Sequence, residues 1–182
     1  MKFVETSLPG VIRIEPSVHS DGRGFFMETW QAQRFRDAGI DADFVQDNFS
    51  HSSKRTLRGL HYQIKQPQGK LVRVVSGEVF DVAVDLRKAS PSFGQWVGET
   101  LSAANKHQLW VPPGLAHGFL VLSDTAEFEY KCTDFYAPEL ERTIRWDDPD
   151  IGIKWPLAKG VQPVLSAKDT AAPFLKDAES YA

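Results

Sequence analysis

Apolar residues recur along this chain in short segments of strand length. Leu57–Gln63, Lys70–Ser76 and Glu78–Leu86 alternate or run apolar in close succession, a pattern typical of β-strands. The same pattern predicts further strands at Val11–Ile14, Phe25–Trp30, Phe44–Phe49, Trp96–Ser102, Gln108–Val111, Gly118–Leu122 and Glu127–Thr133.

Helical signals are few. Gln31–Ala38, closed by Gly39, predicts one short helix, and Ala167–Ala172 a second. The Ser76–Gly77 step between two predicted strands predicts a hairpin turn. Because no helical pattern alternates with the strands, we expect a mainly β fold of the sandwich or barrel type.

Several predicted strands carry polar side chains on the face that should point inward. Alternation along Glu127–Thr133 places Phe128, Tyr130 and Cys132 on one face, and Phe128 marks that face as interior. A barrel filled for stability alone would use apolar side chains there. Converging polar groups therefore indicate a cavity with chemistry in it. The same alternation predicts inward polar side chains at Gln46, Asn48, His61, Asp81 and His117.

Arg58 raises a separate question, because it lies three positions before His61 and strict alternation points it the other way. Gly59 stands between the two residues. A glycine inside a strand often marks a bulge that re-aims a neighbouring side chain. The sequence therefore leaves the direction of Arg58 open.

Composition narrows the function classes. The chain has 182 residues, a formal net charge of -3 and one cysteine. One thiol excludes an internal disulfide and a cysteine-rich zinc site, and it fits a reducing compartment. The slight excess of acidic over basic residues disfavours general nucleic-acid binding. Without a secretory signal, a membrane-length apolar run or a linker, residues 1–182 are expected to form a single cytoplasmic domain.

Two segments resemble the cupin superfamily of double-stranded β-helix barrels. Pro112-Pro113-Gly114-Leu115-Ala116-His117 fits the second cupin motif, and Gly59–Gln63 occupies the place of the first. A metal-binding cupin would have a second histidine where Gln63 stands, followed by a glutamate. His61 and His117 without a third ligand make a poor divalent-metal site, so we predict none.

A closer resemblance covers nearly the whole chain. The ordered segments are similar to those of dTDP-4-dehydrorhamnose 3,5-epimerases, and they include His19–Phe26, Gln46–Ser50, Leu57–Gln63, Gln68–Val74, Val79–Arg87, Tyr130–Tyr136, Trp146–Pro149 and Leu165–Asp169. The resemblance implies a mainly β, double-stranded β-helix (jelly-roll/cupin) barrel with a few short helices, and a C-terminal tail that packs on the barrel. It also implies an isomerase that acts on dTDP-4-keto-6-deoxy-D-glucose without a metal or organic cofactor, as a step toward dTDP-L-rhamnose.

The resemblance assigns roles to four residues. It implies that His61 is the base, since an imidazole titrates near neutrality, and that Asp169 orients it. Lys70 would stabilise the enolate oxygen, and Tyr130 would return a proton on the opposite face. Asp81 is expected to support this network in a lesser role.

The resemblance also implies contacts with the nucleotide or the sugar. In this family the N-terminal strands pair across a homodimer, so Arg23, Phe26 and Glu28 are expected to serve the partner's site. The full set of expected substrate-binding residues is Arg23, Phe26, Glu28, Gln46, Asn48, Arg58, His117 and Tyr136.

Three alternatives stay open at this point. Close relatives that invert only C3 or only C5 would share His61, Lys70 and Tyr130. A metal-dependent cupin oxygenase would rest on His61 and His117 alone. A cupin that binds a nucleotide sugar without catalysis would not need an acid and a base on opposite faces of the cavity.

Overall fold

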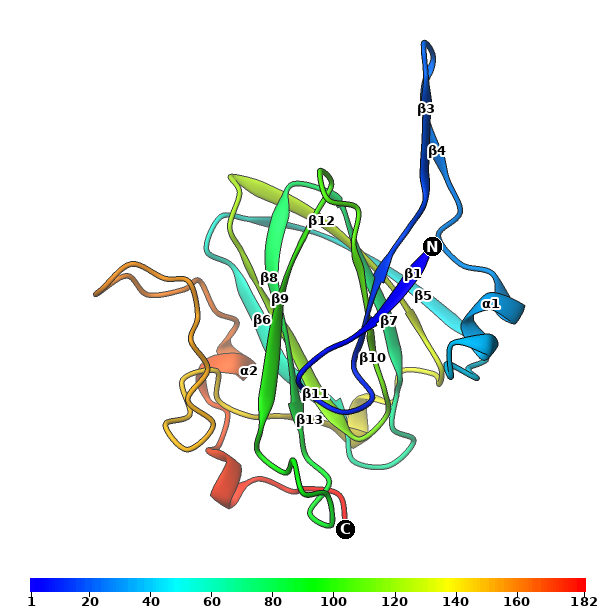
Figure 1. Cartoon of the computed structure of the whole chain (residues 1–182). Helices are drawn as coiled ribbons and strands as arrows, with labels where there is room; N and C mark the ends of the chain where they lie inside the picture. The colour runs from blue at the N-terminus through cyan, green and yellow to red at the C-terminus, as the bar shows by residue number, and fades with distance from the viewer.

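Two antiparallel sheets lie face to face in the computed structural model, which describes residues 1–182 (Figure 1). The six-stranded sheet has the order β1 (Lys2–Glu5), β2 (Ile12–Glu15), β10 (Gln108–Val111), β7 (Lys70–Ser76), β12 (Thr125–Cys132) and β5 (Gln46–Ser53). The five-stranded sheet has the order β13 (Glu141–Thr143), β6 (Leu57–Gln63), β11 (Leu115–Val121), β8 (Glu78–Asp85) and β9 (Trp96–Ser102).

The remaining elements are short. A separate hairpin pairs β3 (Val18–Asp21) with β4 (Gly24–Met27), and two helices, α1 (Ala32–Asp37) and α2 (Ala167–Thr170), lie outside the sheets. Two 3-10 turns occupy Pro138–Leu140 and Leu175–Asp177. This confirms the predicted mainly β, jelly-roll class with few helices.

The core between the sheets is a single cluster of 15 buried apolar residues. Val72 and Phe128 enter it from the six-stranded sheet, while Val79 and Phe119 enter it from the five-stranded sheet. Phe119 and Phe128 stack across the gap with ring centroids 4.2 Å apart. Because both inner faces are apolar here, burial of these side chains fixes the register of the strands that carry the inward polar residues.

Strand positions follow the sequence pattern closely, but the predicted hairpin at Ser76–Gly77 is wrong. The strands on either side of it, β7 and β8, belong to different sheets. Gly77 has a φ of +80°, and a Cβ there would lie 2.1 Å from the carbonyl oxygen of Thr125. The glycine therefore turns the chain sharply from one sheet to the other. The pattern also missed β1, β3 and β13, which have four, four and three residues.

A register shift at Gly59 settles the direction of Arg58. In the β6–β11 ladder, His61 pairs with His117, but Arg58 pairs with Phe119, so β6 holds one extra residue. Gly59 has a φ of +134°, and a Cβ there would lie 2.6 Å from the Cα of Gly118. The shift places Arg58 and His61 along the same cavity.

Replacing Gly59 with alanine is expected to destabilise the protein by roughly 3–5 kcal/mol, because the new methyl group would strike the β11 backbone and strain the dihedral angle. Urea denaturation measures the loss. Gly22→Ala is the matched control, since a Cβ at Gly22 meets nothing within 4 Å. Equal stability of the two variants would contradict the close-approach account.

The C-terminal segment packs against the outer face of the five-stranded sheet. Val164 forms a parallel bridge with Thr56, and Tyr181 forms one with Arg87. The phenol of Tyr181 donates to the carbonyl oxygen of Gln63 at 2.6 Å. These attachments bring α2 beside β6. None of the helices combines the length and the apolar character that crossing a membrane requires.

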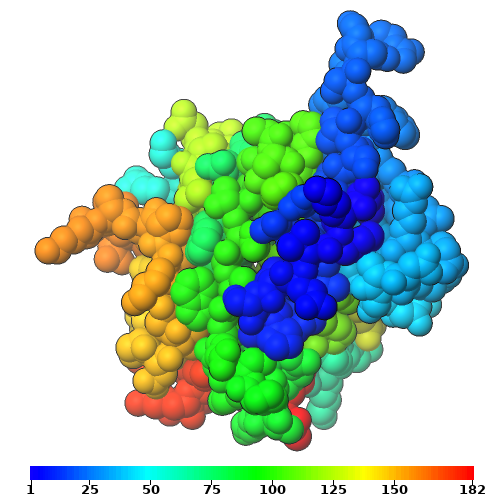
Figure 2. Space-filling view, in the orientation of Figure 1, coloured from blue at the N-terminus to red at the C-terminus, as the bar shows by residue number.

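The β3–β4 hairpin projects away from the body of the molecule (Figures 1 and 2). It carries Phe25 and Phe26, whose exposed fractions are 58% and 73%. Two large exposed aromatic side chains on a two-stranded arm are unusual for an unpartnered surface.

Candidate active site

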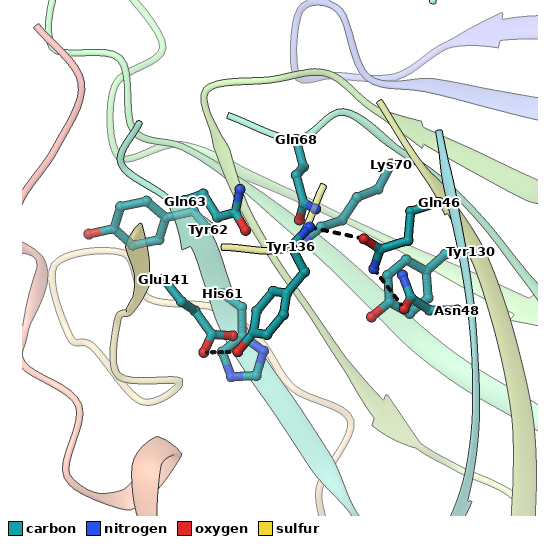
Figure 3. A pocket seen from close by; sticks show the side chains of 10 residues that line it. All are labelled: Gln46, Asn48, His61, Tyr62, Gln63, Gln68, Lys70, Tyr130, Tyr136 and Glu141. Carbon is teal, nitrogen blue, oxygen red and sulfur yellow. Dashed lines mark hydrogen bonds between the residues drawn. The ribbon is translucent and has the colours of Figure 1, made fainter. Parts of the chain in front are cut away.

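A polar cavity opens at one end of the space between the sheets (Figure 3). It consists of two adjoining chambers of about 270 and 260 Å³, which share Asn48, His61, Lys70, Tyr130 and Glu141. The five-stranded sheet contributes His61 from β6, whereas the six-stranded sheet contributes Lys70 from β7 and Tyr130 from β12. The predicted base and the predicted acid therefore belong to opposite walls.

His61 and Asp169 form a dyad across 108 positions of sequence. Nε2 of His61 lies 2.6 Å from Oδ1 of Asp169, and the Asp169 side chain is almost wholly buried. Burial acts to raise the pKa of Asp169, but the hydrogen bond from His61, together with the hydrogen bond to Ser166 and the charge of Lys168, outweighs it, and the pKa is lowered. The ionised carboxylate can only accept, so Nε2–H donates to it and Nδ1 keeps its lone pair.

Asp169 reaches His61 because Ser166 caps α2. The Ser166 side chain accepts a hydrogen bond from the backbone N–H of Asp169 at 3.1 Å, which is a standard N-cap arrangement. The cap fixes the first turn of the helix and with it the direction of Asp169. Burial lowers the pKa of His61 despite the opposing effect of Asp169. The imidazole is therefore neutral, and able to accept a proton, at neutral pH.

Lys70 brings a positive charge to the wall opposite His61. Burial lowers the pKa of its ammonium, while Cys132, Glu141 and Asp81 act in the opposite direction. The ammonium enters none of the hydrogen bonds or ion pairs within the chain, although it lines both chambers. A desolvated cation without a fixed partner is available to negative charge that develops in the cavity.

Tyr130 follows Phe128 on the inner face of β12, as the alternation predicts. Burial raises the pKa of its phenol to about 12, so the hydroxyl keeps its proton at neutral pH. Its ring lies 6.0 Å from that of Phe128, and this contact anchors it to the apolar core. A protonated phenol on the wall opposite a neutral imidazole is suited to give a proton rather than to take one.

His117 and Asp81 form a second histidine–carboxylate pair, deeper in the same wall. Nε2 of His117 lies 2.9 Å from Oδ1 of Asp81, within hydrogen-bond distance, and both side chains are buried. Burial raises the pKa of Asp81, an effect that His117 and Lys70 oppose. Arg58 lies on the second chamber beside them and donates through Nε to Oγ of Ser52 at 3.0 Å. Arg58, His117 and Lys70 together line a chamber suited to anionic groups.

Tyr136 borders the first chamber and is half exposed. Its hydroxyl donates to Oε2 of Glu141 at 3.1 Å, and its backbone N–H donates to Oε1 of Gln46 at 2.9 Å (Figure 3). Gln46 in turn donates to Asn48 at 3.0 Å. The predicted residues Gln46, Asn48 and Tyr136 thus form one hydrogen-bonded group at the cavity.

Glu141 and Lys168 also line the cavity, and the sequence pattern did not single them out. Lys168 Nζ lies 2.8 Å from Oε2 of Glu141. Lys168 precedes Asp169 on α2, and Glu141 begins the three-residue β13. Neither element carries a recognisable period, so no local signal could have identified these two. Tyr62, Gln63 and Gln68 complete the first chamber.

Three of the predicted residues lie away from this cavity. Arg23 and Phe26 occupy the projecting β3–β4 hairpin, where the Arg23 side chain is 92% exposed and pairs with Asp21. Glu28 lies just beyond β4 and pairs with Arg34 at 3.0 Å. The fold of a single chain does not bring them to the site that it forms around His61.

The arrangement supplies a base, a cation and an acid around one cavity. A neutral imidazole oriented by a carboxylate can remove a proton, the ammonium can stabilise the resulting anion, and the phenol can return a proton from the opposite wall. No three histidine, cysteine or carboxylate side chains gather where they could hold a metal ion. Gln63, at the position of a cupin metal ligand, is engaged with backbone groups instead.

The chain is similar to known proteins over nearly its whole length. The family model described as dTDP-4-dehydrorhamnose 3,5-epimerase matches residues 5–177. A Pseudomonas aeruginosa protein of that name is 57% identical over 182 residues, which cover 100% of this chain and 99% of the relative. A Neisseria gonorrhoeae protein of that name is also 57% identical, although this chain spans 55% of its length.

A solved structure extends the likeness to three dimensions. The dTDP-6-deoxy-D-glucose-3,5-epimerase of Legionella pneumophila, in complex with dTDP-4-keto-L-rhamnose, superposes with a TM-score of 0.94. It is 54% identical in sequence, and the match covers 98% of this chain and 94% of that one. On the strength of its sequence, its fold and the family match over nearly its full length, this chain belongs to the dTDP-4-dehydrorhamnose 3,5-epimerase family.

Proposed function

We propose that this protein inverts C3 and C5 of dTDP-4-dehydro-6-deoxy-D-glucose and forms dTDP-4-dehydro-L-rhamnose. The observation that carries the proposal is the His61–Asp169 dyad on one wall of the cavity, with Tyr130 and Lys70 on the other. The relatives at 57% identity carry the name of the double epimerase, which favours inversion at both carbons over inversion at one.

The chemistry follows from the position of the ketone. C3 and C5 both flank C4, so removal of either proton leaves an enolate rather than an unstabilised carbanion. Nδ1 of His61 takes the proton, and the electron pair of the broken C–H bond forms the carbon–carbon double bond of the enolate. Negative charge then develops on the C4 oxygen. Lys70 stabilises that oxygen. Tyr130 then gives its phenolic proton to the opposite face of the carbon, and solvent restores both groups to their starting protonation states.

The second chamber is suited to bind the diphosphate group of the nucleotide. Arg58 and His117 line it together with Lys70, and a guanidinium can bond two oxygens of a phosphate at once. Tyr136 offers a flat, half-exposed ring for the thymine. These contacts hold the nucleotide while the sugar lies between His61 and Tyr130. Product stereochemistry, read by NMR from the sugar-ring coupling constants, tests the proposal: inversion at one carbon alone would replace it with a mono-epimerase.

Replacing Tyr130 with phenylalanine is expected to separate proton removal from inversion. His61 would still abstract the proton and return a solvent-derived one to the same face, so exchange would persist. Net epimerisation would fall by roughly 10²-fold or more, because the acid on the opposite face is gone. NMR in deuterated buffer measures both quantities in one sample. A parallel fall in exchange and inversion would remove Tyr130 from the acid role.

We further propose that the protein is a cytoplasmic homodimer in which the β3–β4 hairpin reaches the partner's site. The projecting arm with exposed Phe25 and Phe26 supports this, and the buried free thiol of Cys132 fits a reducing compartment. Arg23, Phe26 and Glu28 would then contact a nucleotide bound by the other subunit.

Subunit mixing tests the exchanged arm. Arg23→Ala and His61→Asn are each expected to have little activity alone. Mixed dimers would recover activity, since one site then combines native His61 with the Arg23 of the His61→Asn partner. If the hairpin served its own chain's site, no mixed dimer would hold an intact site, and mixing after reversible dissociation would restore nothing.

A further inference from the structure

Tyr136 lies in a segment without regular secondary structure, between the end of β12 at Cys132 and the 3-10 turn that begins at Pro138. Its ring is half exposed, and its hydroxyl has one partner, Glu141. A side chain held this loosely would lose rotamer and backbone freedom on stacking against a base, which weakens binding. The position of the ring therefore depends on what holds the backbone of residues 133–137.

Gln63 holds that backbone on both sides of Tyr136. Its Oε1 accepts a hydrogen bond from the N–H of Ala137 at 2.8 Å, and its Nε2 donates to the carbonyl oxygen of Phe135 at 3.2 Å. These two groups belong to the peptides that flank Tyr136. The side-chain amide thus pairs with the loop as a neighbouring strand would.

The amide of Gln63 is fully engaged with the protein. The second hydrogen of Nε2 goes to the carbonyl oxygen of Gln66 at 2.9 Å, and the residue is only 2% exposed. The backbone carbonyl oxygen of Gln63 accepts the phenol of Tyr181 at 2.6 Å, which ties this end of β6 to the C-terminal segment. No donor of the amide is left for a ligand.

Gln46 completes the clamp from the other sheet. Its Oε1 accepts the N–H of Tyr136 itself at 2.9 Å. Gln46 belongs to β5 and Gln63 to β6, so one glutamine from each sheet fixes the loop. Figure 3 shows the two amides on either side of the Tyr136 backbone. Without Gln63, the peptide between Tyr136 and Ala137 would lose its hydrogen bond, and Gln46 alone would hold the peptide between Phe135 and Tyr136.

We propose that Gln63 is a positioning residue for nucleotide binding: it presents the Tyr136 ring to the base, although it does not bond the nucleotide itself. The inference rests on the proposed function, in which Tyr136 stacks on thymine. At the place where a metal-binding cupin has a histidine ligand, this chain uses an amide to organise the rim of the cavity. Gln63 sets affinity for dTDP, while His61, two residues away on β6, sets the rate together with Asp169 of α2.

The test is a double-mutant cycle on dTDP affinity, measured by isothermal titration calorimetry with the full-length protein. Gln63→Met keeps the side-chain length and removes all three hydrogen bonds. It is expected to weaken dTDP binding roughly tenfold and to raise KM similarly, with kcat changed less than about threefold. In a Tyr136→Ala background the same change is expected to cost less than about twofold, because the ring that Gln63 positions is gone.

Each result has a distinct meaning. An equal loss in both backgrounds, or no loss in either, would overturn the positioning role. A Tyr136→Ala protein with unchanged dTDP affinity would instead refute the stacking contact of the proposed function, and wild-type protein that fails to bind dTDP would refute the nucleotide site as a whole. Gln95→Met is the control, since the Gln95 side chain makes only a long hydrogen bond, of 3.4 Å, to Pro91 on an exposed turn.

A second variant serves if Gln63→Met fails to fold. Gln63→Glu keeps the acceptor for Ala137 but turns an oxygen toward the carbonyl groups of Phe135 and Gln66, which is repulsive when the carboxylate is ionised. Protonation restores one donor, so dTDP affinity of this variant is expected to recover partly as the pH falls from 8 to 6. Affinity that follows the wild-type pH profile would contradict the proposal.

Discussion

Replacing His61 with asparagine is expected to lower kcat by about 10³–10⁴-fold, the upper range for loss of a general base. Asparagine fills similar space and can donate an N–H to the buried carboxylate of Asp169. It has no basic nitrogen, so neither the C3 nor the C5 proton can be removed. Affinity for dTDP should change little, because the nucleotide contacts proposed above involve Arg58, His117 and Tyr136 rather than His61.

The measurement is solvent exchange together with turnover, and His51→Asn is the matched control. His51 lies on β5 with a 60% exposed side chain and takes no part in the cavity. The control variant should behave as wild type. Exchange at a near wild-type rate in His61→Asn would assign the base to another residue, and loss of dTDP binding would indicate a structural defect instead.

The same dyad sets the acid limb of the pH profile. Burial lowers the pKa of His61 below its usual 6.5, and Asp169 opposes the shift. Since the proposed base is the neutral imidazole, kcat/KM should be at its maximum at neutral pH and fall only below the usual pKa of histidine. Asp169→Asn removes the opposing charge, so in that variant the limb should move to still lower pH while kcat drops. A limb that moves upward would contradict this electrostatic account.

The second large effect is expected for Lys70→Met, which should lower kcat by about 10²–10³-fold, as loss of one oxyanion-stabilising group does. Methionine replaces the aliphatic stem without the charge. The ammonium is desolvated and enters no hydrogen bond or ion pair within the chain. It can therefore stabilise the C4 oxygen when that oxygen becomes negative. The effect should fall on kcat more than on KM, because the charge develops only during the reaction.

Thermal stability separates this role from a structural one. Burial of an ammonium is costly, so Lys70→Met should unfold at the same temperature as wild type or at a higher one. Lys131→Met, which removes an exposed pair with Asp47, is the control for loss of one positive charge. A Lys70→Met enzyme with wild-type kcat, or a loss confined to KM, would contradict stabilisation of the enolate.

Strand patterns alone predict much of the cavity. Leu57–Gln63 and Lys70–Ser76 are strands with the predicted bounds, because each has a clear apolar period that the core enforces. The inward direction of Tyr130 follows from Phe128 two residues before it. Alternation therefore identifies several of the side chains that line the cavity, among them Gln46, Asn48, His61 and His117, because the core fixes which face of each strand points inward.

The remainder depends on contacts that no local pattern contains. Asp169 meets His61 across 108 positions, and only the family resemblance predicted the pair. Arg58 joins His61 because of the extra residue at Gly59, which alternation cannot place. Ser76–Gly77 has the composition of a hairpin turn yet joins two sheets, because composition reports a turn but not where the next strand pairs. Gln63 acts through loop peptides, which carry no sequence signature.

Proton NMR of dTDP-4-keto-6-deoxy-D-glucose with this protein, in deuterated buffer that contains a chelator, tests the central claim most directly. We predict deuterium at both C3 and C5 and an L-sugar after reduction of the product, with both signals absent in the His61→Asn variant. Deuterium at only one carbon would contradict double epimerisation. Failure to incorporate deuterium at either carbon, while dTDP still binds, would contradict catalysis by the His61–Asp169 dyad altogether.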